Sequence, residues 1–194
     1  MSLDWKSDFF LEVRRQILHV AGIGSIPVVL SVGLTPVIFG FAVQIIFFTA
    51  LGVYITNRHT RWLETIVYVF ERRGGFPFTG ALTWAIGAAL TFLLFPSMAA
   101  FAGIAVLSFA DATSTLVGKY RGSHKLPLNK EKSWEGSAAF FIIAVLVLRF
   151  FVDPALSIFI AFVVSQIEML PKIDDNITIP LSVGFLVWVF GTVI

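Results

Sequence analysis

Long apolar runs separated by short polar breaks extend along almost the whole chain. A run of about 17–25 mainly apolar residues can cross a hydrocarbon core of roughly 30 Å as a helix. Pro96, Asp153–Pro154 and Pro171 lie close to the ends of such runs, where a helix can stop or restart. The pattern predicts seven spanning helices, at residues 17–34, 36–56, 79–95, 97–117, 134–152, 154–170 and 177–194.

The segment 57–78 follows a different pattern. Its charged residues are Arg58, Arg61, Glu64, Glu71, Arg72 and Arg73, and its apolar stripe is Trp62, Ile66, Val69 and Phe70. This spacing is typical of an amphipathic helix that lies in the membrane interface. Since no repeat or linker divides the chain, residues 1–194 are predicted to form a single membrane-embedded domain.

The composition supports this interpretation. Of the 194 residues, 57% are hydrophobic and only 13% are charged, which predicts an all-α, polytopic integral membrane bundle. A formal net charge of +2 leaves little excess base to neutralise phosphates, so no nucleic-acid partner is expected. Because the chain has no cysteine, any bound metal would need oxygen or imidazole ligands.

The basic residues are unevenly distributed over the predicted topology. Thirteen of the fourteen Lys and Arg fall on one face of the membrane: Lys6, Arg14, Arg15, Arg58, Arg61, Arg72, Arg73, Lys119, Arg121, Lys125, Lys130, Lys132 and Lys172. Only Arg149 falls on the other face. Because cytoplasmic loops carry the excess of Lys and Arg, we predict a multi-pass cell-membrane protein with a cytoplasmic N-terminus.

Polar residues that a bilayer disfavours gather on the same face. Ionisable groups inside spans cost about 2.5–3.5 kcal/mol at a helix centre and usually have a function. At the inner ends of the predicted spans lie Asp111, Glu168, Asp174, Asp175 and Asn176. Glu12, Arg15 and His19 recur on one face of the entering helix. Each also has a plainer interpretation, as a buried packing group or an ordinary interfacial residue.

Residues 111–137 form a basic, glycine-containing segment between the fourth and fifth predicted helices. Gly118 and Gly122 are expected to end the fourth helix, where glycine tolerates the left-handed conformation of a C-terminal cap. The lysines of the segment are Lys119, Lys125, Lys130 and Lys132. Ser133 is the predicted N-cap of the next helix, whose first amides, from Trp134, Glu135, Gly136 and Ser137, would form an anion site.

Carboxylates facing a basic anion site point to a bridging cation. Mg²⁺ prefers carboxylate and phosphate oxygens, so the residues predict a metal-dependent nucleoside triphosphate site at the cytoplasmic membrane surface. Neither GxxxxGK[ST] nor GxGxxG occurs, so the residues alone do not name the nucleotide. The rival hypothesis is a transporter of an anionic solute in which Asp111 and Glu168 couple to protons.

Three motifs resemble those of the CTP-dependent lipid kinases, the family of dolichol kinase, phytol kinase and the CTP-using diacylglycerol kinase. They are E-x-R-R-x-x-x-H at Glu12 to His19, D-A-x-x-x-x-x-G-x-x-x-G with KEKSWEGS at Asp111 to Ser137, and DDNITIP at Asp174 to Pro180. The resemblance covers nearly the whole chain in order and spacing. It implies that Lys132, Ser133, Glu135, Gly136 and Ser137 bind CTP.

The resemblance implies phosphorylation of a membrane lipid alcohol, a polyprenol or dolichol first, by the γ-phosphate of CTP. The expected magnesium ligands are Asp111, Asp175 and Glu168. Lys119, Lys125, Lys132 and Arg15 would bind the phosphates, and the base could be His19, Asp174 or Asp175. The alternative is a phosphatidate cytidylyltransferase, although EMLPKIDDNITIP lacks the K-R-x-x-x-x-K-D motif typical of that family.

Overall fold

The computed structural model describes residues 5–58, 61–71, 75–171 and 174–191, and Arg72, Arg73 and Lys172 lie outside these ranges. The helices are α1 (Trp5–Ala21), η1 (Gly22–Gly24), α2 (Ser25–Val32), α3 (Leu34–Arg58), α4 (Arg61–Phe70), α5 (Thr79–Leu94), α6 (Ser97–Val106), η2 (Leu107–Asp111), α7 (Ala112–Arg121), α8 (Trp134–Leu148), α9 (Pro154–Glu168) and α10 (Asp175–Phe190). Within the described ranges the only strand-like pairing is an isolated bridge between Lys125 and Ser133. The predicted all-α class is confirmed.

Three continuous helical segments are long and apolar enough to cross a membrane: Phe9–Val32, Leu34–Arg58 and Ser97–Arg121. The apolar helices α5, α8, α9 and α10 occupy the other four predicted positions but are only 15 or 16 residues long. The protein is therefore a helical membrane protein, while the count of seven spans stays a prediction. Helix α4 forms where the amphipathic helix was predicted.

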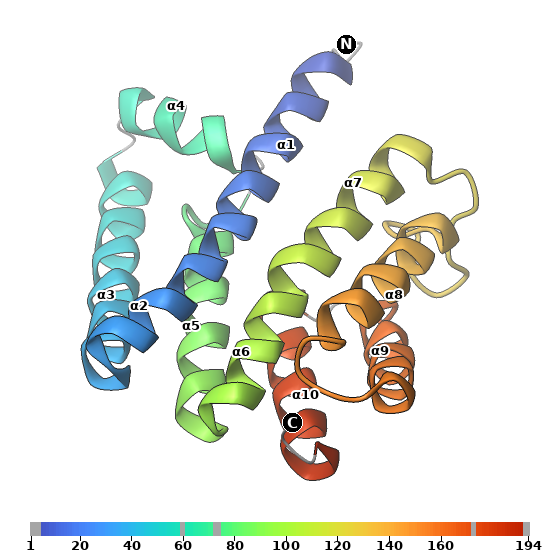
Figure 1. Ribbon diagram of the computed structural model, residues 1–194. Coiled ribbons are helices and arrows are strands. Elements are labelled where there is room, and N and C mark those ends of the chain that lie inside the picture. The colour runs from blue at the N-terminus through green and yellow to red at the C-terminus, as the bar shows by residue number, and fades with distance from the viewer. Residues whose placement is uncertain (1–4, 59–60, 72–74, 172–173, 192–194) are drawn as a thin grey trace.

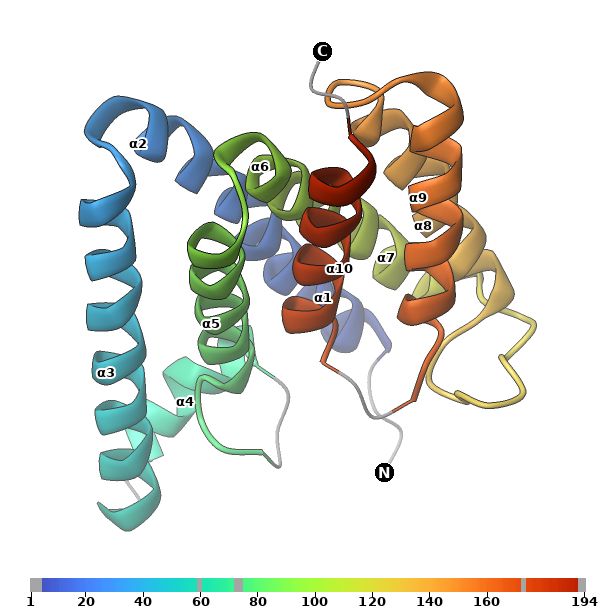
Figure 2. The ribbon, with the colours of Figure 1, turned by 90° about the horizontal axis from the view of Figure 1, so that it is seen from below.

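The helices form a bundle with α6 and α10 at its centre (Figures 1 and 2). Both views place α3 at one edge, with α5 beside it, and α8 and α9 at the opposite edge. The start of α1, helix α4 and the loop between α7 and α8 lie at one end of the bundle, and the end of α10 lies at the other (Figure 1). Elements that carry described Lys and Arg residues of the predicted basic face, the start of α1, helix α4 and the loop between α7 and α8, thus lie at one end of the structure.

Glycine and proline allow α10 to pack closely against α5 and α6. Pro180 lies inside α10 and has no N–H, so the helix cannot use the carbonyl of Asn176 in the usual way. Gly87 of α5 lies against that carbonyl, and Gly103 of α6 lies against the carbonyl of Pro180. Small residues at a helix interface let the backbones approach. This contact fixes the N-terminal end of α10, which carries Asp175 and Asn176.

The prediction that Gly118 and Gly122 end a helix in a left-handed conformation is wrong. Helix α7 continues through Gly118 to Arg121, and its C-cap residue Gly122 has φ −70°. Both glycines instead allow α7 to approach the start of α8, because a Cβ on Gly122 would lie 2.5 Å from Ser133 Oγ and one on Gly118 would lie 3.2 Å from the same atom. At Gly122 a Cβ would also lie 2.1 Å from the Gly118 carbonyl oxygen, so the local turn of the chain and the approach of α8 both favour glycine there.

Adding one methyl group at Gly87 should test the contact between α5 and α10. The Cβ of Gly87→Ala would overlap the Asn176 carbonyl, and overpacking of this kind typically costs about 1–3 kcal/mol of unfolding free energy. Gly40→Ala is the matched control, because a Cβ at Gly40 of α3 would meet no atom within 4 Å and alanine favours a helix. Denaturation in detergent should show a loss for the first variant alone, and equal stability of the two would contradict the close contact.

Candidate functional site

A cavity of about 550 Å³ opens at the end of the bundle that carries the basic residues. Its walls come from α1, η2, α7, α8, α9 and α10, from the loop before α8, and from the segment that leads into the start of α5. Twelve of the thirteen predicted site residues line it: Arg15, His19, Asp111, Lys119, Lys125, Lys132, Ser133, Gly136, Ser137, Glu168, Asp174 and Asp175. The fold therefore brings together residues that are far apart in the sequence.

Lys132 is the central cation of the cavity. Its Nζ lies 2.9 Å from Glu168 Oε1 and 2.7 Å from Asp175 Oδ2, and it also donates a hydrogen bond to the Glu168 carbonyl. Ser137 Oγ donates to the second oxygen of Glu168 at 2.8 Å. Burial opposes the charge of the ammonium, but the two carboxylates outweigh it and raise the pKa of Lys132. Lys132 is therefore charged at neutral pH and links the start of α8 to α9 and α10.

Glu12 organises a second cationic wall. Its side chain is 0% exposed, and its two oxygens lie 2.8 Å from Lys119 Nζ and 2.7 Å from an Arg15 nitrogen. Gln16 Nε2 also donates to Glu12, at 3.0 Å. The sequence placed Glu12 on the polar stripe of the first helix but not among the site residues. In the structure this buried carboxylate holds two predicted phosphate-binding cations at the cavity.

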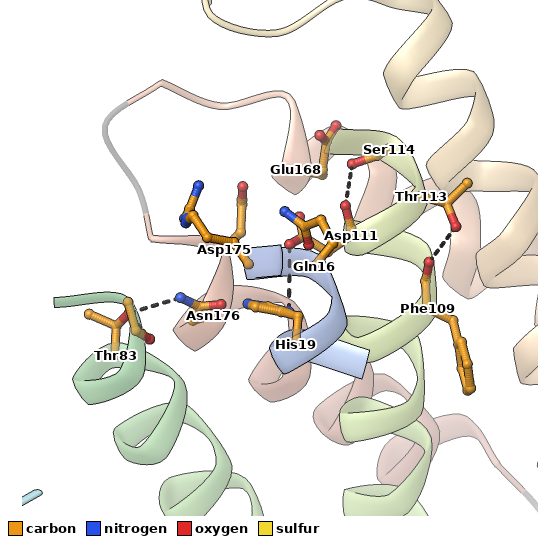
Figure 3. Close-up of polar contacts among 12 residues, drawn as sticks. Gln16, His19, Thr83, Phe109, Asp111, Thr113, Ser114, Glu168, Asp175 and Asn176 are labelled. Carbon is orange, nitrogen blue, oxygen red and sulfur yellow. Dashed lines mark hydrogen bonds and ion pairs between the residues drawn. The ribbon is translucent and has the colours of Figure 1, made fainter. Parts of the chain in front are cut away.

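Asp111 and His19 face each other deeper in the cavity (Figure 3). Asp111 ends the π-helical turn η2, and its side chain is 10% exposed. Its Oδ2 lies 4.0 Å from His19 Nδ1, which is too long for a direct hydrogen bond. A wide π turn commonly marks a functional position in a helix, although it has no simple sequence signature. The turn presents the Asp111 carboxylate within electrostatic reach of Lys132 and Glu168.

The predicted anion site at the start of α8 has the expected N-cap. Ser133 has an extended backbone, and its Oγ accepts the Gly136 amide at 3.2 Å, which confirms the prediction of a cap. Gly136 and Ser137 line the cavity, whereas Glu135 does not. The Glu135 carboxylate accepts the amides of Ser123 and His124 and lies 2.7 Å from the His124 ring. Glu135 thus holds the basic loop closed.

The expected magnesium ligands are close to a cation already present in the chain. Among the described residues, no group of three His, Asp or Glu side chains is arranged to hold a metal ion. Two of the expected ligands, Glu168 and Asp175, instead both contact the Lys132 ammonium, which lies between them. The oxygen donors themselves suit Mg²⁺. Asp174 has a structural contact, because it caps α10 by accepting the Asn176 amide at 3.0 Å.

The motifs did not predict the wall between α4 and α5. Glu71, Phe76, Thr79 and Gly80 all line the cavity. Glu71 accepts the Gly80 amide at 3.1 Å, and the Phe76 ring packs against Gly52 of α3. Phe78 has a left-handed φ of 66° and stacks on Phe48, with ring centroids 4.7 Å apart. The Phe-Pro-Phe-Thr-Gly sequence carries a turn signal, but only tertiary packing against α3 brings it to the cavity.

Comparison with known proteins yields several relatives. A probable chloroplastic phytol kinase of Triticum aestivum is 36% identical over 106 residues, covering 44% of this chain and 35% of the relative. The CTP-dependent diacylglycerol kinase 1 of Eremothecium gossypii is 24% identical over 154 residues, covering 75% of this chain and 48% of the relative. An uncharacterized protein of Rickettsia prowazekii is 28% identical over 201 residues, covering 90% of this chain and 92% of the relative.

These matches confirm the resemblance to the CTP-dependent lipid kinases. The chain spans about a third of the length of the phytol kinases it matches. No family model matches the chain. No solved structure matches it either.

Replacing Lys132 should reveal how strongly it holds the cavity together. In Lys132→Met two largely buried carboxylates lose their shared cation, and breaking a buried pair of this kind costs about 3 kcal/mol or more. Lys125→Met is the control, because Lys125 is exposed and surface changes usually stay within about 0.5 kcal/mol. Unfolding in detergent without nucleotide measures both. A Lys132 variant as stable as the Lys125 variant would contradict the central role of the ammonium.

Proposed function

We propose that this protein transfers the γ-phosphate of CTP to the hydroxyl of a membrane lipid alcohol. One observation carries the proposal: acidic and basic side chains from five helices meet in one cavity at the basic end of a membrane bundle. The names of the relatives support the nucleotide and the class of acceptor. The narrower proposal is an isoprenoid alcohol of the polyprenol or dolichol type, since phytol is also an isoprenoid alcohol.

The triphosphate would bind between the two cationic walls. Lys119 and Arg15, held by Glu12, form one cationic wall of the cavity, and Lys132 before α8 forms the other. The amides of Gly136 and Ser137 already bond to Ser133, so they are not counted among the phosphate donors. The positive end of the α8 dipole and the neighbouring ammonium and guanidinium groups together favour phosphate. Phosphoryl transfer depends mainly on positioning and charge neutralisation, which this arrangement supplies. Lys125, at the exposed rim, would meet the nucleotide as it enters.

Asp111, Glu168 and Asp175 would hold Mg²⁺ against the phosphates. When bound, the ion would neutralise charge on the phosphate oxygens. Lys132 occupies the space between two of these carboxylates, so cation binding requires its ammonium to release at least one of them. A released Lys132 remains beside the start of α8, where it would contact a phosphate. The residues therefore fit the ion if Lys132 exchanges a carboxylate for the nucleotide.

The reaction replaces one P–O bond by another. The lipid oxygen forms a bond to the γ-phosphorus, and the bond from this phosphorus to the β–γ bridging oxygen breaks, so that CDP leaves. The hydroxyl proton passes to a base, for which His19, Asp174 and Asp175 are the predicted candidates. We place this chemistry at the cytoplasmic face of the cell membrane, because the cavity lies at the end that carries most of the Lys and Arg.

Labelled CTP separates this proposal from its alternatives. The protein in detergent, incubated with Mg²⁺, phytol, polyprenols, dolichol, diacylglycerol or phosphatidate, should move label from the γ-position of CTP into lipid. Transfer of label from the α-position would instead show cytidylyl transfer. The same cavity residues could support that reaction if CTP bound with its α-phosphate where the kinase reaction places the γ-phosphate. Absence of transfer from either position would contradict a kinase and leave the transporter hypothesis, although the polar residues gather at one end of the bundle and not at its middle.

Asp111→Asn should abolish phosphoryl transfer while the protein stays folded. The substitution keeps the shape of the side chain but removes the negative charge needed to hold a cation in the cavity, so turnover should fall by at least about 100-fold. Asp153→Asn provides a matched control, because Asp153 caps α9 at the other end of the bundle and asparagine is an equally good cap. Initial rates at saturating CTP, with thermal midpoints for both variants, measure the difference. An Asp111 variant with nearly normal turnover would remove this carboxylate from the mechanism.

A further inference from the structure

Phe76 differs in chemistry from the rest of the cavity wall. Among the described residues that line the cavity, Phe76 is the only one with a large apolar side chain, and it is 40% exposed. Its neighbours on the same wall are Glu71, Gly75, Thr79 and Gly80. A long hydrocarbon chain would need a continuous apolar surface, which one ring among polar and small residues does not offer. The wall instead suits a flat, polar ligand that stacks on the ring.

The chain holds the Phe76 ring in place before any ligand binds. The ring packs on Gly52 of α3 so closely that a Cβ at Gly52 would lie 2.5 Å from it. The Phe76 carbonyl accepts the amide of Thr79 at 3.3 Å and also its hydroxyl. A ring that is already fixed loses little conformational freedom when a ligand stacks on it, so the stacking free energy goes largely into affinity.

The backbone of the same turn is strained. Phe78 has a φ of 66°, in the left-handed region that a bulky residue seldom adopts. Its ring stacks on Phe48 of α3, with centroids 4.7 Å apart, and this packing keeps the conformation in place. Glycine would form such a turn without strain. Strain that the surrounding structure maintains is typical of binding and active sites.

Glu71 places a hydrogen-bond acceptor on the same wall. Its Oε1 accepts the Gly80 amide at 3.1 Å, which ties the carboxylate to the start of α5. A carboxylate has two oxygens and about four acceptor positions, so Glu71 can accept further hydrogens from a ligand. Cytosine carries an amino group, a donor, at the position where uracil carries a carbonyl oxygen, an acceptor. A carboxylate beside a stacked pyrimidine therefore favours cytosine.

The wall that carries Phe76 and Glu71 lies away from the central cation of the cavity. Figure 2 shows the start of α5 on the α3 side of the bundle and helices α8 and α9 on the opposite side. Lys132 and Glu168 belong to that opposite side. Phosphates drawn to the cations would leave the Phe76 wall to the uncharged part of the nucleotide.

We propose that the Phe76 ring stacks on the pyrimidine of the nucleotide and that Glu71 accepts a hydrogen bond from the amino group of cytosine. The inference rests on the proposed function for the identity of the nucleotide. It goes beyond that proposal by naming the residues that recognise the base, which lie outside the three motifs that resemble lipid kinases.

Kinetics of Phe76 variants test the stacking. Phe76→Leu should raise the KM for CTP on the order of 10-fold with little change in kcat or in the KM for the lipid alcohol, because it removes a contact to the base alone. Phe76→Tyr keeps an aromatic face and should retain most of the affinity. Phe39→Leu is the matched control, because Phe39 is 70% exposed on α3 and does not line the cavity. A rise in the KM for the lipid in place of that for CTP would overturn the inference.

The choice between CTP and UTP tests Glu71. In Glu71→Gln the amide oxygen can accept the Gly80 hydrogen while its nitrogen donates toward the base, an arrangement that suits the carbonyl of uracil. The unmodified protein should prefer CTP over UTP in kcat/KM, and the variant should lower that preference on the order of 10-fold or more. Glu131→Gln, which changes another carboxylate of the cavity wall, should leave the preference unaltered. The same preference in Glu71→Gln as in the unmodified protein would remove Glu71 from base recognition.

Equilibrium binding separates failure of this inference from failure of the proposed function. Phe76→Leu should weaken the binding of labelled CTP to the protein in detergent and leave that of inorganic triphosphate, which has no base, unchanged. Equal weakening of both would show a purely structural role for the ring and overturn the inference. If CTP binds as expected but no phosphate reaches a lipid, only the kinase proposal fails, whereas a protein that binds no CTP overturns both. Thermal midpoints identify a Phe76→Leu protein that has merely unfolded, and Phe76→Tyr and Glu71→Gln then carry the test.

Discussion

The contact of the Lys132 ammonium with Glu168 and Asp175 is the interaction on which the cavity depends. It joins the end of the basic loop to the end of α9 and the start of α10, which lie 36 and 43 residues further along the chain. Each carboxylate would be costly at the edge of a membrane without a cation, and the ammonium would be costly without them. Ser137 completes the arrangement by donating to the free oxygen of Glu168. Because every charge in this group has a partner, the group can be largely buried and still fix the geometry of the cavity.

Close packing of the helix backbones holds these side chains in position. Pro180 and Gly87 let α10 approach α5, so that Asn176 bonds to Thr83 and lies beside His19 (Figure 3). The π turn that ends at Asp111 places this carboxylate at the start of α7. Gly118 and Gly122 let the C-terminal part of α7 lie close to the start of α8. These irregular features of the helices coincide with the motifs that resemble lipid kinases. The proline of DDNITIP and the glycines of the Asp111 segment therefore allow neighbouring helices to pack closely, in addition to any role of these motifs in chemistry.

The sequence predicted the helices, the Ser133 cap and the gathering of Asp111, Lys132, Glu168 and Asp175, because apolar length, capping preference and the cost of buried charge are local or additive properties. It did not predict tertiary features. Gly118 and Gly122 were predicted to end a helix in a left-handed conformation, because the sequence alone does not show that α8 packs against them. Glu135 belongs to a nucleotide motif by resemblance, yet it pairs with His124, and nothing local distinguishes the two uses. The segment around Phe76 joins the cavity only through its packing on α3.

The pairing of charges also constrains how an anionic substrate can enter. Lys119 and Arg15 contact Glu12, and Lys132 contacts Glu168 and Asp175, so each of these three cations already has an anionic partner. A triphosphate that binds here must compete with carboxylates for the same cations, and a divalent ion that arrives with it can take the carboxylates released in exchange. When phosphates replace the carboxylates at the cations and a metal ion replaces the cations at the carboxylates, no buried charge is left unpaired. Such an exchange costs less free energy than breaking the ion pairs without replacement. On the proposed function, the resting ion pairs thus favour a nucleotide that brings a metal over an anion that comes alone.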